Sequence, residues 1–203
     1  MTEHYFNENP MVEHDEKMIK AVFFDKEFNF KTDAGVFSKN GVDYGTSLLI
    51  SDFGVTDESK ILDLGCGYGP IGIVTAARLL KGQVVFADIN ERAVDLTKYN
   101  LVLNKHLINN DVKVQVIKTQ NFINIKEKQF DYILLNPPIR AGKETVYKLF
   151  NDSWRHLKEK GELWIVIQKK QGALSAIKKL KTIFSAVNEV QRKKGYYIVK
   201  SVK

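Results

Sequence analysis

The chain has 203 residues, of which 44% are hydrophobic and 27% charged, and no apolar run approaches the ~20 residues that a membrane-spanning helix needs. This composition is typical of a soluble globular protein. The first 17 residues are rich in acids and do not have the apolar block of a secretory signal. The single cysteine, Cys66, excludes an internal disulfide. We therefore expect a cytoplasmic protein with no membrane partner.

The net charge of +7 is distributed unevenly along the chain. From Gln168 to Lys203 there are ten Lys/Arg residues and one acid, Glu189, whereas the preceding 167 residues hold 21 basic and 23 acidic residues. A basic region of this kind suits a polyanion such as RNA, although lysine-rich faces also simply solvate helices and strands. Charge alone leaves both interpretations open.

The first 50 residues differ in pattern from the rest. Residues 22–30 place apolar segments around an Asp25-Lys26 turn signal, which predicts a β-hairpin. Residues 37–50 predict a loop that leads into a short helix ending near Phe53. We expect residues 1–50 to form an extension packed on a main domain of residues 51–203.

Strand and helix patterns alternate from Lys60 onward. Strands are predicted at 61–64, 84–87, 112–116, 130–135, 162–167, 184–190 and 196–202, and helices at 71–80, 90–103, 145–157 and 173–180. This alternation predicts an α/β fold with a doubly wound, mostly parallel sheet, whose last two strands pair as a hairpin across residues 192–195. Ligands of such sheets bind outside the carboxyl ends of the strands, where residues 63–72, Asp88 and residues 136–140 fall.

The glycine-rich loop at residues 63–72 predicts a cofactor site. Gly65 and Gly67 allow a sharp turn and close approach of a ligand, beside Cys66, and Asp63 adds a fixed carboxylate. Residues 67–72 also fit the dinucleotide pattern G-x-G-x-x-G, with Asp88 about 20 residues further on. A carboxylate beside a pyrophosphate is repelled, however, and Pro70 offers no N–H to a phosphate. We therefore predict S-adenosylmethionine, whose cationic amino-acid end suits Asp63.

Two further segments are candidates for the nucleoside half of this cofactor. Asp88 can accept hydrogen bonds from both ribose hydroxyls; the alternative role, capping the next helix, suits Asn90 better. Ile89 could pack on the adenine ring. Asn121 and Phe122 follow the third strand and are predicted beside the adenine, although core packing explains Phe122 equally well.

The Asn136-Pro137-Pro138 turn predicts the reaction. The Asn136 side-chain oxygen and the Pro137 carbonyl can accept both hydrogens of a planar amino group, and the prolines keep these acceptors aimed. No general base and no metal are needed, and the four histidines and Cys66 show no ligand spacing. The tripeptide alone could be a plain turn, but its place after a buried strand favours catalysis. Guanine, adenine and protein glutamine all remain possible acceptors.

These motifs carry a family resemblance. Three motifs carry it, D-L-G-C-G-Y-G-P-I-G, A-D-I-N and N-P-P-I-R, together with G-V-F-S-x-x-x-V-D-Y-G-T-x-L-L at residues 35–49. With these segments the chain resembles the RsmC-type 16S rRNA guanine-N2 methyltransferases. The resemblance implies a Rossmann-like seven-stranded sheet with an antiparallel last strand, S-adenosylmethionine as methyl donor, and a guanine amino group of ribosomal RNA as acceptor. RsmC-type proteins carry an extra N-terminal copy of the domain, whereas this chain has one copy.

The resemblance also suggests individual roles. Thr46 would contact the amino-acid end of the cofactor. Ile139 stands where many amino-methyltransferases have an aromatic ring that stacks on the base, so Phe37 is a candidate substitute, with ordinary core packing as the alternative. Arg140 would hold phosphate or guanine, or pair with a surface acid. The basic cluster that would grip RNA phosphates comprises Lys169, Lys170, Lys178, Lys179, Lys181, Arg192, Lys193 and Lys194.

Two questions stay open at this point. A non-catalytic RNA-binding module is the alternative from a different class, and the intact Asp63, Asp88 and Asn136 argue against it. The oligomeric state, monomer or dimer, has no signal in the sequence.

Overall fold

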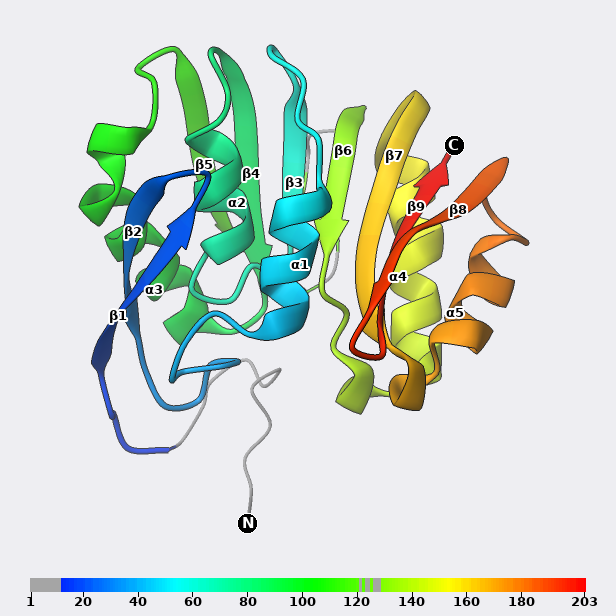
Figure 1. Ribbon diagram of the computed structural model, residues 1–203, viewed down its shortest axis with the longest axis horizontal. Coiled ribbons are helices and arrows are strands. Elements are labelled where there is room, and N and C mark those ends of the chain that lie inside the picture. Colours follow the sequence, from blue (N-terminus) through cyan, green and yellow to red (C-terminus); the bar gives the residue numbers. More distant parts are fainter. Residues whose placement is uncertain (1–11, 121, 123–124, 126–128) are drawn as a thin grey trace.

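The computed structural model describes residues 12–120, 122, 125 and 129–203, in which a seven-stranded sheet is covered by helices on both faces and flanked by a two-stranded hairpin (Figure 1). No helix in these ranges is long and apolar enough to cross a membrane. The strands are β1 (Lys17–Phe23), β2 (Lys26–Thr32), β3 (Lys60–Leu64), β4 (Gly82–Asp88), β5 (Val112–Lys118), β6 (Phe130–Leu135), β7 (Leu157–Gln168), β8 (Ala186–Lys193) and β9 (Tyr196–Val202). The α-helices are α1 (Tyr44–Asp52), α2 (Pro70–Ala76), α3 (Glu91–Leu103), α4 (Lys143–His156) and α5 (Ala173–Leu180), and short 3₁₀ helices are η1 (Lys105–Leu107), η2 (Ile139–Ala141) and η3 (Lys169–Gln171).

The sheet has the order β5-β4-β3-β6-β7-β9-β8, and β9 runs antiparallel to both of its neighbours. This confirms the predicted Rossmann-like sheet with its antiparallel last strand. The strand order reverses between β3 and β6, which pair in parallel with Leu64 opposite Leu135. Since ligands of doubly wound sheets bind at such a switch point, the glycine-rich loop after β3 and the Asn136 turn after β6 leave the sheet side by side.

Side-chain alternation along the strands builds two cores. Ile61, Val84 and Phe86 face α1, α2, α3 and the hairpin, whereas their neighbours Leu62 and Val85 face α4 and α5. All five are fully buried. Strands covered on both faces show continuous apolar runs, and this is why residues 130–135 were identifiable from sequence.

Buried asparagines attach the β1–β2 hairpin to the main sheet. Asn100 on α3 accepts a hydrogen bond from the Lys31 backbone N–H (2.7 Å) and donates to the carbonyls of Lys31 (2.9 Å) and Tyr68 (2.8 Å). Asn104, one turn later, makes the same reciprocal pair with Asn29. The hairpin therefore packs directly beside the glycine-rich loop. The division into residues 1–50 and 51–203 stays a prediction.

Several element boundaries differ from the sequence prediction. Helix α2 ends at Ala76 rather than Leu80, because the chain turns at Ala77 and places Leu79 in the core. Strand β7 begins at Leu157, not at residue 162, since Leu157 pairs with Phe130 beyond an irregularity in the ladder. Strand β8 covers Ala186–Lys193, so the hairpin turn is Lys194-Gly195 alone.

Candidate active site

A cavity of about 350 Å³ opens at the carboxyl edge of β3, β4 and β6. It brings together the three predicted motifs and the segment before α1. Its lining comprises Val36, Phe37, Ser38, Asp43, Thr46, Gly65, Cys66, Gly67, Tyr68, Pro70, Ile71, Asp88, Ile89, Ala93, Asn136, Pro137, Pro138, Ile139, Arg140, Gln171 and Tyr196.

The glycine-rich loop needs its glycines for conformation and for space. Gly65 and Gly67 have φ angles of 69° and 58°, in the left-handed region, and a Cβ on either would meet nothing within 4 Å. The space that a side chain would fill is therefore open to a ligand. Cys66 is buried between them, and burial raises the pKa of its thiol well above the ordinary value.

Asp63 lies fully buried beneath this loop and does not line the cavity. Its Oδ2 accepts a hydrogen bond from the Gly72 N–H in α2 (2.8 Å), whereas its Oδ1 has no partner in the described part of the chain. Burial raises the pKa of Asp63 to about 7, the Gly72 N–H lowers it, and nearby Asp88 raises it further. In this geometry Asp63 fixes the loop to α2. Its predicted contact with the cofactor stays a prediction, for which Oδ1 is the available atom.

Asp88 closes the loop from the neighbouring strand and lines the cavity. Its Oδ2 accepts from the Gly67 N–H (2.8 Å) and its Oδ1 from the Asn90 N–H (2.9 Å). Burial raises the pKa of Asp88, and these backbone donors partly offset the shift. Asn90 caps α3 through a bond from the Ala93 N–H, which leaves Asp88 free of the capping role. Each carboxylate oxygen has a further lone pair, which suits ribose hydroxyls.

The Asn136 side chain is held in a defined orientation. Its Nδ2 donates to Thr46 Oγ1 on α1 (3.0 Å), and Thr46 is itself buried. The Thr46 backbone N–H donates to the carboxylate of Asp43, the N-cap residue of α1, and this bond fixes the start of the helix. Because the amide NH₂ is engaged by Thr46, its Oδ1 is the atom left for a ligand; no partner of Oδ1 occurs among the described residues.

The proline carbonyls complete this arrangement. The Pro138 carbonyl accepts from the Ala141 N–H (2.9 Å) as η2 begins, whereas no described N–H donates to the Pro137 carbonyl. Two aimed acceptors, Asn136 Oδ1 and the Pro137 carbonyl oxygen, are thus available at the cavity wall. The open loop and Asp88 on one wall and these acceptors on another leave space for a ligand between them.

Comparison with known proteins decides the family. The sequence model described as "Methyltransferase small domain" matches residues 27–200, which is most of the chain. The chain belongs to the small-domain methyltransferases. Its cofactor is S-adenosylmethionine. Gly65, Cys66, Gly67, Asp88 and Ile89 all line the cavity, and their contacts with the cofactor stay a prediction.

Individual relatives place this methyltransferase within the family. It is 48% identical over the full length of both chains to "Uncharacterized protein YbxB" of Bacillus subtilis (strain 168). It is 34% identical to ribosomal RNA small subunit methyltransferase C of Cronobacter sakazakii, over 69% of this chain and 40% of that one. It is 31% identical to ribosomal RNA large subunit methyltransferase G of Psychromonas ingrahamii, over 84% of this chain and 44% of that one. The chain thus spans less than half the length of these named ribosomal RNA enzymes.

The fold is also that of a solved enzyme. The T. thermophilus 16S rRNA N2 guanine methyltransferase RsmC, in complex with AdoMet and guanosine, matches 96% of this chain and 52% of its own, with a TM-score of 0.79 at 23% identity. This likeness shows a shared fold.

The methyltransferase cavity contains residues that sequence reasoning missed. Tyr196, the first residue of β9, and Gln171 in η3 line it beside Arg140. The Tyr196 ring lies so close to Gly45 that a Cβ there would meet Cε1 at 2.6 Å. No local motif indicates either residue, because a long-range return of the chain brings them to the site.

Other predicted residues lie outside the cavity. Phe122 packs on the His156 ring (centroids 4.3 Å apart) in the core that faces α4 and α5. Asn121 lies outside the described residues. Lys169 and Lys170 are exposed next to Gln171 without lining the cavity themselves. Phe37 and Ile139 do line it, and Phe37 is 38% exposed.

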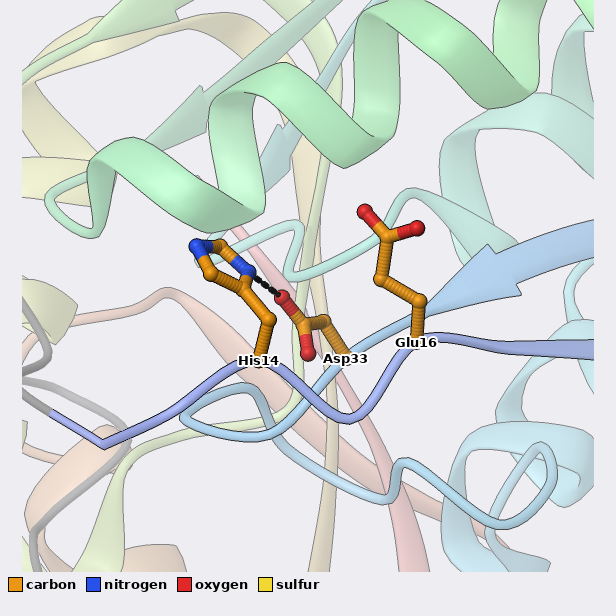
Figure 2. Close-up of side chains that lie close together, drawn as sticks. All are labelled: His14, Glu16 and Asp33. Atoms are coloured by element: carbon orange, nitrogen blue, oxygen red, sulfur yellow. Dashed lines mark hydrogen bonds and ion pairs between the residues drawn. The ribbon is translucent and has the colours of Figure 1, made fainter.

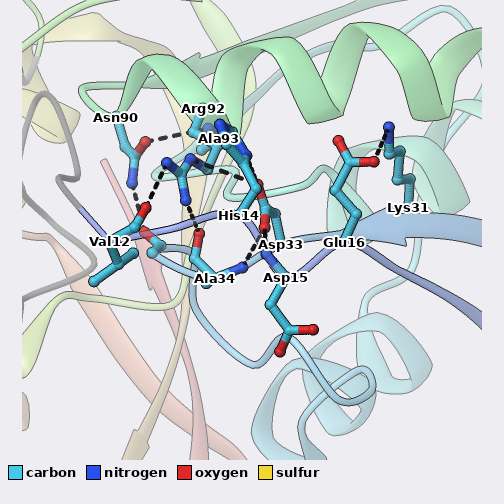
Figure 3. A network of polar contacts seen from close by, with 11 residues as sticks. Val12, His14, Asp15, Glu16, Lys31, Asp33, Ala34, Asn90, Arg92 and Ala93 are labelled. Carbon is cyan, nitrogen blue, oxygen red and sulfur yellow. Dashed lines mark hydrogen bonds and ion pairs between the residues drawn. The ribbon is translucent and has the colours of Figure 1, made fainter.

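A second polar cluster lies away from the methyltransferase cavity. His14, Glu16 and Asp33 lie close together with the donor atoms of a metal site (Figure 2), but each is already engaged. His14 Nδ1 and the guanidinium of Arg92 face one Asp33 oxygen, two backbone N–H groups bind the other, and Glu16 pairs with Lys31 (Figure 3). The cationic Arg92 disfavours a metal ion here. The cluster instead ties the segment around residue 14 to α3, and Arg92 also donates to the Ala34 and Val12 carbonyls.

Proposed function

We propose that this methyltransferase transfers the methyl group of S-adenosylmethionine to the exocyclic N2 of a guanine in ribosomal RNA. The observation that carries the proposal is the Asn136 amide, whose Nδ2 is bonded to Thr46 and whose Oδ1 is left available beside the cofactor loop. Such an amide accepts hydrogen bonds from an amino group and does not donate to it.

The chain's own residues would act by positioning the acceptor. S-adenosylmethionine, when bound, supplies an already activated methyl group, so orientation can provide most of the rate. Asn136 Oδ1 and the Pro137 carbonyl oxygen accept the two amino hydrogens and thereby hold the nitrogen with its lone pair directed away from them. They would also stabilise the positive charge that develops on that nitrogen as its bond to the methyl carbon forms and the carbon–sulfur bond of the sulfonium breaks. One of the amino protons would then be released to water.

The apolar side of the cavity suits a flat base. Ile139 and Pro138 offer contacts on the Asn136 side, and Phe37 and Tyr196 contribute rings to the same lining. Bases in a duplex cannot reach such a cavity, so the guanine would enter unpaired or flipped out of its helix. Between them, the two rings supply the stacking surface that Ile139 lacks.

The choice of guanine and of ribosomal RNA is supported by similarity. Ribosomal RNA small subunit methyltransferase C shares 34% identity, and RsmC of T. thermophilus, which shares the fold, is described as an N2 guanine enzyme. The basic C-terminal region is consistent with a nucleic-acid partner.

Methyl transfer to unmethylated bulk RNA tests the proposal. The purified chain is incubated with S-adenosylmethionine carrying a tritiated methyl group, and the RNA is digested to nucleosides for chromatography. We expect label in N2-methylguanosine. Label in N6-methyladenosine would move the assignment to adenine, label in a protein fraction would move it to glutamine, and failure to bind S-adenosylmethionine would favour a non-catalytic RNA-binding module.

A further inference from the structure

The topology divides the basic C-terminal region between two opposite edges of the sheet. Strand β8 runs in the same direction as β7, because β9 is antiparallel to both, so Gln168 and Lys193 both lie opposite Tyr196. The Lys169 N–H also donates to the Gly195 carbonyl (2.8 Å). Helix η3 and the β8–β9 turn therefore meet at the carboxyl edge of the sheet (Figure 1). The cavity opens at the same edge.

Five exposed cations gather at this edge, and we call them the edge cations. None of them forms a salt bridge with an acid in the described part of the chain, and the charge of Lys193 lowers the pKa of Asp52, which burial raises. They are Arg140, Lys169, Lys170, Lys193 and Lys194.

Other cations of the same region are either paired or distant. Arg192, Lys200 and Lys203 pair with Glu189, Glu162 and Glu159. Lys178, Lys179 and Lys181 lie in or just after the last turn of α5. This helix begins beside η3 and leads away from the carboxyl edge, since Ser185, which follows it, bonds to Val202 at the far end of β9. Six residue steps along β9 separate the two edges by about 20 Å.

Aromatic rings connect the edge cations to the cavity. The Lys194 ammonium lies 5.0 Å from the centre of the Tyr44 ring, and Tyr44 packs edge-to-face on Tyr196 (5.6 Å, 60°), which lines the cavity. Arg140 lines the same cavity. Cations next to aromatic rings are the usual composition of a surface that binds unpaired RNA, with phosphates on the cations and bases on the rings.

We propose that the edge cations bind the RNA phosphates flanking the target nucleotide, and that the β8–β9 turn and η3 are the RNA-docking elements of this chain. The inference rests on the proposed function for the identity of the partner. It excludes Lys178 and Lys181 from the interface, although they belong to the same basic stretch of sequence.

Two charge-matched double variants test this assignment. Lys193→Gln with Lys194→Gln removes two edge cations, and Lys178→Gln with Lys181→Gln removes two cations from the opposite edge. Binding of a fluorescein-labelled RNA stem-loop with a guanine-containing loop is measured by fluorescence anisotropy. The salt concentration is varied over a roughly sixfold range, from about 50 to about 300 mM, so that the slope of log affinity against log salt can be determined. Losing two phosphate contacts should lower the magnitude of the log–log salt slope by about 1.4 to 1.8 and weaken binding roughly 25- to 60-fold at 0.1 M salt.

The outcomes separate this inference from the proposed function. We expect the edge variant to lose affinity and slope while the control variant stays within about twofold of wild type. Equal losses of affinity in both variants would attribute the effect to net charge and overturn the inference. An edge variant that binds RNA like the wild type would also overturn it. So would a wild-type chain that has no affinity for RNA. Anisotropy requires no turnover, so binding and methylation are scored separately. An edge variant that binds RNA with wild-type affinity and still forms N2-methylguanosine would refute only the docking surface. Weakened binding with a different methylated product would refute only the guanine assignment.

Discussion

Replacing Thr46 by valine tests how the acceptor atom of Asn136 is held. Valine keeps the branched shape but removes the hydroxyl that accepts the 3.0 Å hydrogen bond from Asn136 Nδ2. Thr46 is only 4% exposed, so water does not readily replace the lost partner. The amide then gains a second orientation, in which NH₂ rather than Oδ1 faces the cavity.

The size of the effect follows from two limits. Removing one aimed hydrogen-bonding group from a transition state costs about 10²- to 10³-fold in rate, whereas a neutral hydrogen bond between side chains contributes only about 0.5–1.5 kcal/mol. Loss of the orienting bond should therefore lower kcat about tenfold, which corresponds to ~1.4 kcal/mol. Asn136→Ala sets the upper limit, with a loss of about 10²- to 10³-fold.

Single-turnover methyl transfer at saturating cofactor, together with calorimetric titration of S-adenosylmethionine, separates the two roles proposed for Thr46. We expect Thr46→Val to lower the transfer rate and to leave the cofactor Kd within about threefold, and Thr46→Ser, which keeps the hydroxyl, to restore most of the rate. An effect confined to the cofactor Kd would refute the positioning role and support a direct contact with the cofactor. An unchanged rate would refute the account of the Asn136 amide.

Three other substitutions have defined outcomes. Asp88→Ala should weaken S-adenosylmethionine binding at least about tenfold in calorimetry, because Asp88 both lines the cavity and bonds to the Gly67 N–H; a wild-type Kd would refute its cofactor role. Asp63→Asn should flatten the pH dependence of stability. In the wild type the pKa of Asp63 is about 7 in the folded chain against the ordinary 3.8, so the folded chain keeps a proton that the unfolded chain releases. The free energy of unfolding of the wild type should therefore fall by up to about 4 kcal/mol as pH rises from about 4 to about 7. Urea titrations across this range check this, and an unaltered slope in the variant would contradict it. Asn100→Ala should lower the free energy of unfolding by about 2–4 kcal/mol, because the buried Asn100 side chain loses three hydrogen bonds to Lys31 and Tyr68. A change below about 0.5 kcal/mol would show that the hairpin is held by other contacts.

The sequence was sufficient for features that depend on local pattern. The apolar run at 130–135 and the N-cap Asn90 are local sequence signals, and the strand and the cap both occur where predicted. The placement of Gly65, Asp88 and Asn136 around one cavity also followed, since parallel strands end at a common edge.

Features that depend on distant parts of the chain could not be predicted. Tyr196 reaches the cavity only because β9 returns antiparallel to β7, and the Asn136–Thr46 bond joins residues 90 positions apart. Burial of Asp63 beneath its own loop is likewise a result of packing, so the bond from the Gly72 N–H to its Oδ2 had no signal in the sequence. The early start of β7 was hidden because residues 158–160 are polar.

Replacing guanosine by inosine in an RNA substrate tests the central claim most directly, because inosine lacks only the 2-amino group. Transcripts made with either nucleotide from one template, carrying the same adenines, are offered to the wild-type chain with labelled S-adenosylmethionine. We predict methyl incorporation into the guanosine transcript, its loss in the inosine transcript, and its loss from both with Asn136→Ala. Equal incorporation into the two transcripts would contradict the assignment of the Asn136-Pro137 acceptors to the guanine amino group.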